Sequence, residues 1–161
     1  LFPYTTLFRS HSSMDTPMSQ GTRCRQLAEY VVFESPLNML CDSPTNYDRE
    51  EECTEFIATI PTVWEQTIAM NGEIGKYITM ARRKGDVWYV GSLTNWDART
   101  LTLDLSFLGA GRWKAEMFHD GVNANRLASD YQKTVTDIPA SRKLTVKMAQ
   151  GGGCALKIYK E

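Results

Sequence analysis

Carboxyl groups are the residues of this sequence whose chemistry could support acid–base catalysis. Such catalysis needs two carboxyl groups that face one substrate. Several acids gather at Asp48, Glu50 to Glu52 and Glu55. They stand in the first turns of an expected helix, where carboxylates favour the helix dipole and stay solvated. We therefore predict structural roles for them and assign no catalytic residue to this chain.

Asp42 is a carboxylate in a different setting. It ends the mostly apolar run 36–42 and precedes Ser43 and Pro44. An aspartate before Ser-Pro is typical of an Asx-type turn, which is one interpretation of this residue. The second interpretation is that Asp42 lines a substrate pocket, which depends on the fold around it.

The sequence has no motif typical of a metal site or of a phosphate-binding loop. His11 and His119 have no partner at the spacing of a metal site or a catalytic triad. The four cysteines, Cys24, Cys41, Cys53 and Cys154, form no C-x-x-C pair. We expect free, buried thiols, with a Cys41–Cys53 bridge as the alternative. The run Gly151 to Gly153 precedes an expected strand rather than a helix, so it indicates a turn.

Tryptophan side chains could bind a sugar by stacking on its ring. Trp88 alternates with apolar neighbours on both sides, which is typical of a strand that is covered on both faces. Trp96 follows Asn95 and precedes Asp97, so we expect it to be exposed. It is the candidate for sugar stacking; the alternative is a loop aromatic that packs on a neighbouring element.

Length and composition limit the class of protein. The chain has 161 residues, 42% hydrophobic and 23% charged, with a formal net charge of −1. This balance is typical of a folded domain and argues against a disordered chain or a nucleic-acid-binding protein. No apolar run approaches the roughly 20 residues that a transmembrane helix needs, so we expect no membrane partner.

The elements that would position these residues fall into two groups. Spacings of three and four predict a helix over 22–34, and Pro36 ends it. The run 36–42 predicts a buried strand, and 46–60 predicts a second helix with acid in its first turn. Helix, strand and helix make one unit of a parallel α/β architecture. Alone, that unit could not cover its strand, so we expect 21–61 to belong to a larger sheet.

Beyond Pro61 the pattern changes to short alternating runs separated by turns. Lys84-Gly85-Asp86 is the clearest hairpin signal. The expected strands cover 64–70, 74–83, 86–94, 100–106, 112–119, 132–138, 143–149 and 154–159. About eight strands in this length are typical of an antiparallel β-sandwich. We predict a mainly β chain in which 62–161 form the sandwich and fold independently of 21–61.

The first twenty residues have a different origin in our interpretation. Residues 1–10 resemble one reading frame of a widely used sequencing adapter, and 11–20 are polar. We expect 1–20 to be a scar followed by a poorly ordered lead.

Several strings resemble the C-terminal part of glycoside hydrolase family 97, and the resemblance covers about 140 residues in order. The strings are QLAEYVVFESPLNMLCDSPTNY (26–47), ECTEFIATIPTVWEQT (52–67), ITMARRKGDVWYVGSLTNW (78–96), LTLDLSFLG (101–109), FHDGVNANRLASDY (118–131) and GGGCALKI (151–158). The family combines an N-terminal β-domain, a (β/α)₈ barrel and a C-terminal β-domain. The resemblance implies that 22–34 are the seventh barrel helix, 36–42 the eighth strand and 46–60 the last helix.

The resemblance also implies function. The family hydrolyses α-glucosides with inversion or α-galactosides with retention, and its members use calcium. Its catalytic carboxylates and calcium ligands lie upstream of this chain, so we expect a non-catalytic fragment without a metal site. Its partners would be its own barrel, the oligosaccharide substrate and a further copy in a homo-oligomer; its location would be periplasmic or extracellular.

Two residues gain a role from that resemblance. Active sites of barrels form at the carboxyl ends of the strands. Asp42 and Met39 would then line the rim of the sugar pocket. The alternative function for the chain is a carbohydrate-binding module that uses Trp96.

Overall fold

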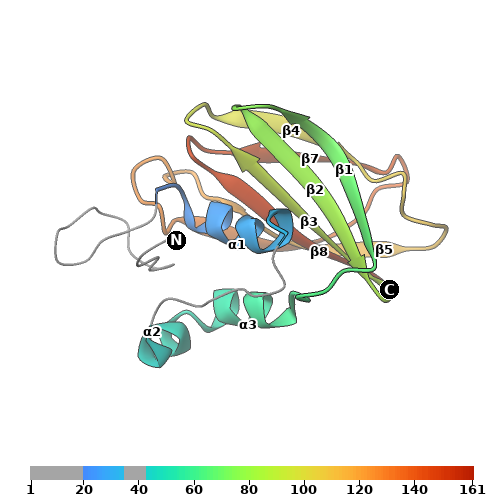
Figure 1. Cartoon of the computed structure of the whole chain (residues 1–161), viewed down its shortest axis with the longest axis horizontal. Helices are drawn as coiled ribbons and strands as arrows, with labels where there is room; N and C mark the ends of the chain where they lie inside the picture. Colours follow the sequence, from blue (N-terminus) through green and yellow to red (C-terminus); the bar gives the residue numbers. More distant parts are fainter. Residues whose placement is uncertain (1–19, 35–42) are drawn as a thin grey trace.

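The computed structural model describes residues 20–34 and 43–161 (Figure 1). Three helices precede eight strands. The helices are α1 (Arg23–Val32), α2 (Pro44–Arg49) and α3 (Glu51–Thr59). The strands are β1 (Gln66–Glu73), β2 (Tyr77–Lys84), β3 (Val87–Thr94), β4 (Arg99–Asp104), β5 (Trp113–Asp120), β6 (Tyr131–Asp137), β7 (Lys143–Met148) and β8 (Gly153–Lys160). The strand expected at 36–42 lies outside the described residues.

Within the described residues all strand pairs are antiparallel, and they form two sheets. Six strands pair in the order β1-β2-β3-β8-β5-β6, and β4 pairs with β7 in a second sheet of two strands. Apolar side chains from both sheets meet between them, among them Trp88, Leu103 and Ile158. The predicted mainly β sandwich is therefore confirmed, with each expected strand found within a few residues.

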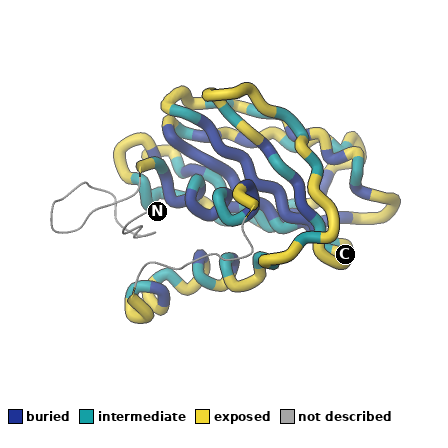
Figure 2. The backbone as a smooth tube through the Cα atoms, viewed as in Figure 1, coloured by how far each residue is buried: buried dark blue, intermediate teal, exposed yellow. Residues whose placement is uncertain are grey.

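The second face of the six-stranded sheet is covered by α1 (Figures 1 and 2). Leu27, Ala28 and Val31 have no exposed surface. The backbones approach closely because β3 presents Gly91 and β8 presents Gly153 to the helix. A Cβ on Gly91 would lie 2.7 Å from the Ala28 carbonyl oxygen, which is closer than atoms can pack. Glycine at these two positions lets the helix sit directly on the sheet.

Both ends of α1 are fixed by polar contacts. The Thr22 hydroxyl accepts a hydrogen bond from the Arg25 backbone N–H at 3.1 Å and caps the N-terminus. At the other end Arg82 of β2 is buried and donates from Nη2 to the Val32 carbonyl at 3.0 Å. A cation at the C-terminal end of a helix is favourable because the last carbonyls carry partial negative charge.

The helix expected over 46–60 is divided at Glu50. This residue takes φ −118° and ψ 45°, outside the helical region, and so separates α2 from α3. Its carboxylate accepts a hydrogen bond from Arg23 Nη1 at 2.9 Å. The sequence predicted a solvated carboxylate at this position and did not predict the ion pair. Further along, Phe56 of α3 packs on Phe118 of β5 with ring centroids 4.8 Å apart.

The helices and the sheet therefore share one apolar cluster, which includes Leu27, Phe56, Leu93 and Phe118. All residues of α1 are buried or half-buried. No gap in packing separates α1 from the sandwich that follows residue 61, although the sequence placed them in different domains. None of the helices in the two described segments is long and apolar enough to cross a membrane.

Candidate functional site

The structure describes some of the site residues that the sequence predicted and not others. Asp42 and Met39, the expected pocket rim, lie outside the described residues, and their role stays a prediction. Trp96 lies in the loop between β3 and β4 and is 61% exposed. Trp88 and Trp113 are buried between the sheets, as expected for Trp88. The loop around Trp96 is therefore the candidate binding site.

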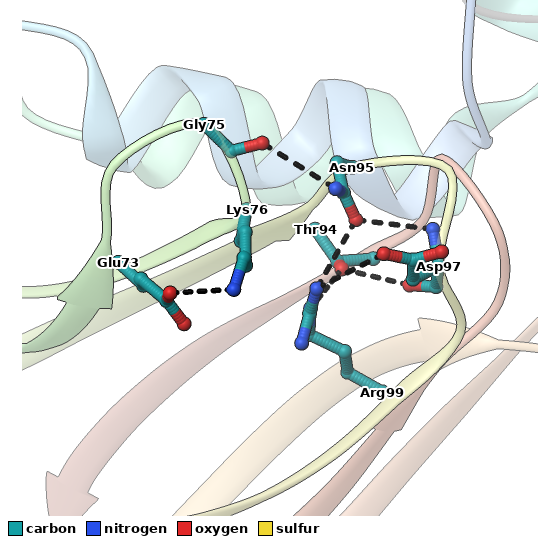
Figure 3. Close-up of polar contacts among 7 residues, drawn as sticks. All are labelled: Glu73, Gly75, Lys76, Thr94, Asn95, Asp97 and Arg99. Atoms are coloured by element: carbon teal, nitrogen blue, oxygen red, sulfur yellow. Dashed lines mark hydrogen bonds and ion pairs between the residues drawn. The ribbon is translucent and has the colours of Figure 1, made fainter.

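Polar side chains hold the Trp96 loop in one conformation (Figure 3). The Asn95 Oδ1 accepts hydrogen bonds from the Asp97 backbone N–H at 3.0 Å and from Arg99 Nη2 at 3.3 Å. Arg99 Nε donates to the Thr94 Oγ1 at 3.0 Å, and that hydroxyl donates to the Asp97 carbonyl at 2.9 Å. The Asn95 side chain also donates to the Gly75 carbonyl, and Arg99 also binds the Asp97 carboxylate. Because the Asn95 and Arg99 side chains each bind three partners, the loop is preorganised.

Two neighbouring segments fix this loop to the rest of the sandwich. The Asn95 backbone N–H donates to the Lys76 carbonyl at 2.7 Å, in the turn between β1 and β2. The Asn95 carbonyl in turn accepts from the Gly151 backbone N–H at 2.8 Å, in the turn before β8. Beside it Lys76 pairs with Glu73 at 2.6 Å (Figure 3). Segments around 75, 95 and 151 thus meet at one corner of the molecule.

The Trp96 indole packs on Gly151. A Cβ on Gly151 would lie 2.7 Å from Trp96 Cζ3 and 3.0 Å from Cε3, so a side chain there would displace the ring. Gly151 also has φ +62°, in the left-handed region that glycine adopts most readily. Gly151 is buried and Trp96 is exposed, so the indole contacts the glycine and still presents most of its surface to solvent. We call the Trp96 indole, Gly151 and the loop 94–99 the Trp96 platform.

A shallow hollow of about 480 Å³ lies next to the Trp96 platform. It is lined by residues of α1 and of the β1–β2 and β3–β4 corners, including Arg25, Ile74, Tyr77 and Asn95. Arg25 donates from Nη1 to the Thr94 carbonyl at 2.7 Å, so the N-terminal part of α1 forms one wall. The hollow offers polar groups beside an apolar surface.

A larger hollow of about 800 Å³ lies beside β5, β6 and β7, and Asp120 is part of its lining. The Asp120 Oδ2 accepts from the Ala149 and Gly153 backbone N–H groups at 2.8 and 3.2 Å. Burial raises the pKa of the Asp120 carboxyl, while hydrogen bonds from the Thr22 hydroxyl and these N–H groups oppose the shift. This carboxylate fixes the turn before β8 and the start of α1, which is a structural role.

A second group of polar residues joins α2 and α3 to the sheet. Arg23 pairs with Glu50, and the Tyr131 hydroxyl donates to Glu52 Oε2 at 2.8 Å. The Arg23 guanidinium also lies over the Tyr131 ring, 5.3 Å from its centroid. Burial, reinforced by the bond to Glu52, raises the pKa of the Tyr131 hydroxyl. Glu50 therefore links this segment to α1, and Glu52 links α3 to β6. The sequence predicted solvated acids at the helix start, so it did not predict these contacts.

Metal-binding chemistry has no candidate within 20–34 and 43–161, because no group of three or more His, Cys, Asp or Glu converges there. His119 lies at the end of β5, with its Nδ1 3.2 Å from the Asp120 carbonyl oxygen. Cys24, Cys53 and Cys154 are free, buried thiols, and Cys41 lies outside the described residues. Burial raises the pKa of each of the three thiols, so they are unreactive at neutral pH.

Sequence reasoning identified Trp96 but missed the residues that support it. The Asn95-x-Asp97 spacing is an Asx-turn pattern and could have indicated the turn. The role of Gly151 could not be found in this way, because the contact joins positions 55 residues apart, from Trp96 to Gly151. Gly151 was expected only to form a turn.

The chain is similar to known proteins over most of its length. A family model described as "Glycosyl-hydrolase 97 C-terminal, oligomerisation" matches residues 63–159. A retaining alpha-galactosidase of Bacteroides thetaiotaomicron is 61% identical over 142 residues, which cover 88% of this chain and 22% of that protein. A probable retaining alpha-galactosidase of Streptomyces bingchenggensis is 29% identical over 96 residues, or 60% of this chain and 15% of that protein.

Solved structures extend the similarity to the helices. A glycoside hydrolase family 97 enzyme from Pseudoalteromonas sp. strain K8, in complex with acarbose, has a TM-score of 0.85 and 35% identity. The match covers 98% of this chain and 26% of the enzyme. The chain thus spans about a quarter or less of the length of these relatives.

Proposed function

Because this chain belongs to glycoside hydrolase family 97, we propose that it is the non-catalytic C-terminal domain of a retaining α-galactosidase that acts on α-linked galactosides. The activity is proposed for the whole protein, whose remaining part carries the catalytic carboxylates. The 61% identity to an enzyme of that name supports the choice of galactoside over glucoside.

The observation that carries this proposal is the way in which helices and sheet are joined. Glu50 binds the buried Arg23, Glu52 accepts from the Tyr131 hydroxyl, and Asp120 accepts from backbone N–H groups. Retention or inversion requires two carboxyl groups at opposite sides of one sugar. Acids that are already committed to holding helices on strands serve to support a domain rather than to catalyse.

The division of the chain is also part of the proposal. We assign 21–61 to the end of the (β/α)₈ barrel and 62–161 to the C-terminal sandwich, with 1–20 as a lead. Support for the boundary comes from the family model of the C-terminal region, which matches residues 63–159. The packing of α1 on β3 and β8 would then join the sandwich to the barrel wall.

The remaining roles follow from this placement. Asp42, at the carboxyl end of the eighth strand, and Met39 would line the rim of the sugar pocket. A calcium ion would bind in the upstream part, since the described residues offer no set of ligands that fits it. The intact protein would form a homo-oligomer, as the description of the matching family region suggests.

A hydrolysis assay tests the proposal. The 161-residue chain should release no nitrophenol from 4-nitrophenyl α-galactoside, while the protein with its upstream part should do so and should retain the anomeric configuration. Light scattering should show an oligomer for the longer protein. Hydrolysis by the 161-residue chain would refute the assignment, and so would a longer protein that cleaves only α-glucosides.

A further inference from the structure

We propose that the Trp96 platform is a carbohydrate-binding site, where the exposed face of the indole stacks on a pyranose ring of an α-linked oligosaccharide. The site is absent from the proposed function and stands on its own geometry. Only the choice of α-linked sugars rests on the proposed function.

The geometry of the platform suits a flat ligand. Trp96 is 61% exposed, although its Cζ3 and Cε3 atoms contact Gly151. Most of the indole surface is therefore open to solvent. The loop beneath is fixed by Asn95 and Arg99, so little conformational entropy is lost when a ligand binds. An aromatic ring that is held in place and still mostly exposed can accept a planar partner.

The chemistry of a pyranose matches this surface. Its axial C–H groups make one face apolar and slightly positive, which complements the negative face of the indole. Its hydroxyl groups need hydrogen-bonding partners around the ring. The Asp97 side chain is 71% exposed, the Lys76 side chain is 52% exposed, and Gln150 precedes the supporting glycine. The segments that meet at the Trp96 platform thus carry donors and acceptors as well as an aromatic ring, the combination that small-molecule sites use.

Other exposed apolar residues lack these features. Val63 and Val135 are about as exposed as Trp96, at 61% and 60%, but they are aliphatic and offer no flat ring. Trp64, the other tryptophan that is partly accessible, packs edge-on to Tyr89 with centroids 5.5 Å apart. Among the tryptophans of the described segments, Trp96 is the one that is exposed rather than buried or half-buried.

Affinity electrophoresis of the 161-residue chain tests the proposal. Gels contain pullulan, an α-linked glucan, or guar galactomannan, which carries α-linked galactosyl groups on a β-linked mannan backbone; unsubstituted β-mannan and barley β-glucan are the β-linked comparisons. The chain should be retarded by an α-linked polymer, and Trp96→Ala should weaken the interaction roughly tenfold or more. Val63→Ala, at a site of equal exposure, should migrate as the wild type does. Gly151→Ala should also weaken binding, because its Cβ displaces the indole.

Nuclear magnetic resonance of the wild-type chain makes the test independent of how the variants fold. Raffinose and panose, added as free oligosaccharides, should shift the indole N–H signal of Trp96, which is assigned from its absence in Trp96→Phe. A shift at another tryptophan only, no retardation by an α-linked polymer, or retardation by β-glucan alone would each overturn the proposal. The proposal would also be overturned if the shift of the Trp96 signal disappeared in the longer protein, because Trp96 would then contact the upstream part instead of a sugar.

Discussion

Removing residues 1–61 should unfold the sandwich, because α1 covers β3 and β8, the two central strands of the six-stranded sheet. Leu27 and Val31 have no exposed surface, and Val32 retains 8%. Burying each of these side chains contributes about 1.5–3 kcal/mol, so the three together give about 5–9 kcal/mol. A whole domain is stable by only about 5–15 kcal/mol. The sequence led us to expect that 62–161 fold alone, but this packing leads us to expect aggregation.

A substitution measures the same effect in the full chain. Leu27→Ala should lower the free energy of unfolding by about 2–5 kcal/mol. At about 4 °C per kcal/mol for a domain of this size, the melting temperature should fall by about 8–20 °C. Leu127→Ala is the matched control, since the same atoms are removed from a side chain that is 47% exposed. Its change should stay within about 0.5 kcal/mol.

The measurement is urea denaturation followed by circular dichroism, together with light scattering of residues 62–161. Truncated protein that is monomeric and melts in a single cooperative transition near that of the full chain would refute the reasoning. Equal losses from Leu27→Ala and Leu127→Ala would refute it as well, because burial under α1 would then contribute nothing.

Three further predictions concern the contacts around α1. Gly91→Ala should destabilise the chain by about 1–3 kcal/mol in urea, because the new Cβ would meet the α1 backbone at 2.7 Å. Glu50→Gln should cost about 1–3 kcal/mol in the same assay by weakening the ion pair with Arg23, and high salt should not abolish the difference, because the Arg23 side chain is only 4% exposed. Burial raises the pKa of the Asp120 carboxyl in the folded state, so its contribution to stability falls as the pH rises from its unfolded pKa of about 3.9 through the folded value. Asp120→Asn removes the titrating group. The melting temperature of this variant should therefore fall less between acidic and neutral pH than that of the wild type, and an identical dependence on pH would contradict the prediction.

The strands could be predicted from sequence because each one carries its own local signal. Alternating apolar residues and turn glycines such as Gly85 are enough to locate a hairpin. Pairing is harder, since β8 lies between β3 and β5, and no local pattern indicates that the last strand occupies the centre. The break at Glu50 was missed for a similar reason, because its partner Arg23 is 27 residues away.

In the candidate site, too, only the features with a local sequence pattern could be predicted. Trp96 was identified from its polar neighbours, which are local in sequence. Gly151 and its contact with the indole depend on the meeting of two distant loops. The cover that α1 gives to the sheet was also missed, since the helical period of 22–34 predicts an apolar face but not what that face covers. Local patterns thus gave the elements, and long-range packing decided their roles.

The segment that connects α3 to β1 bears on how the two proposed domains move. Domains joined by a flexible linker usually change their relative orientation. Here the Tyr89 hydroxyl donates to the Thr59 carbonyl at 2.6 Å, and the Glu65 backbone N–H donates to the Arg83 carbonyl at 2.9 Å. Trp64, between these two points, packs on Tyr89. Because the connection is bonded to the sheet on both sides, the sandwich should move with the helices as one body.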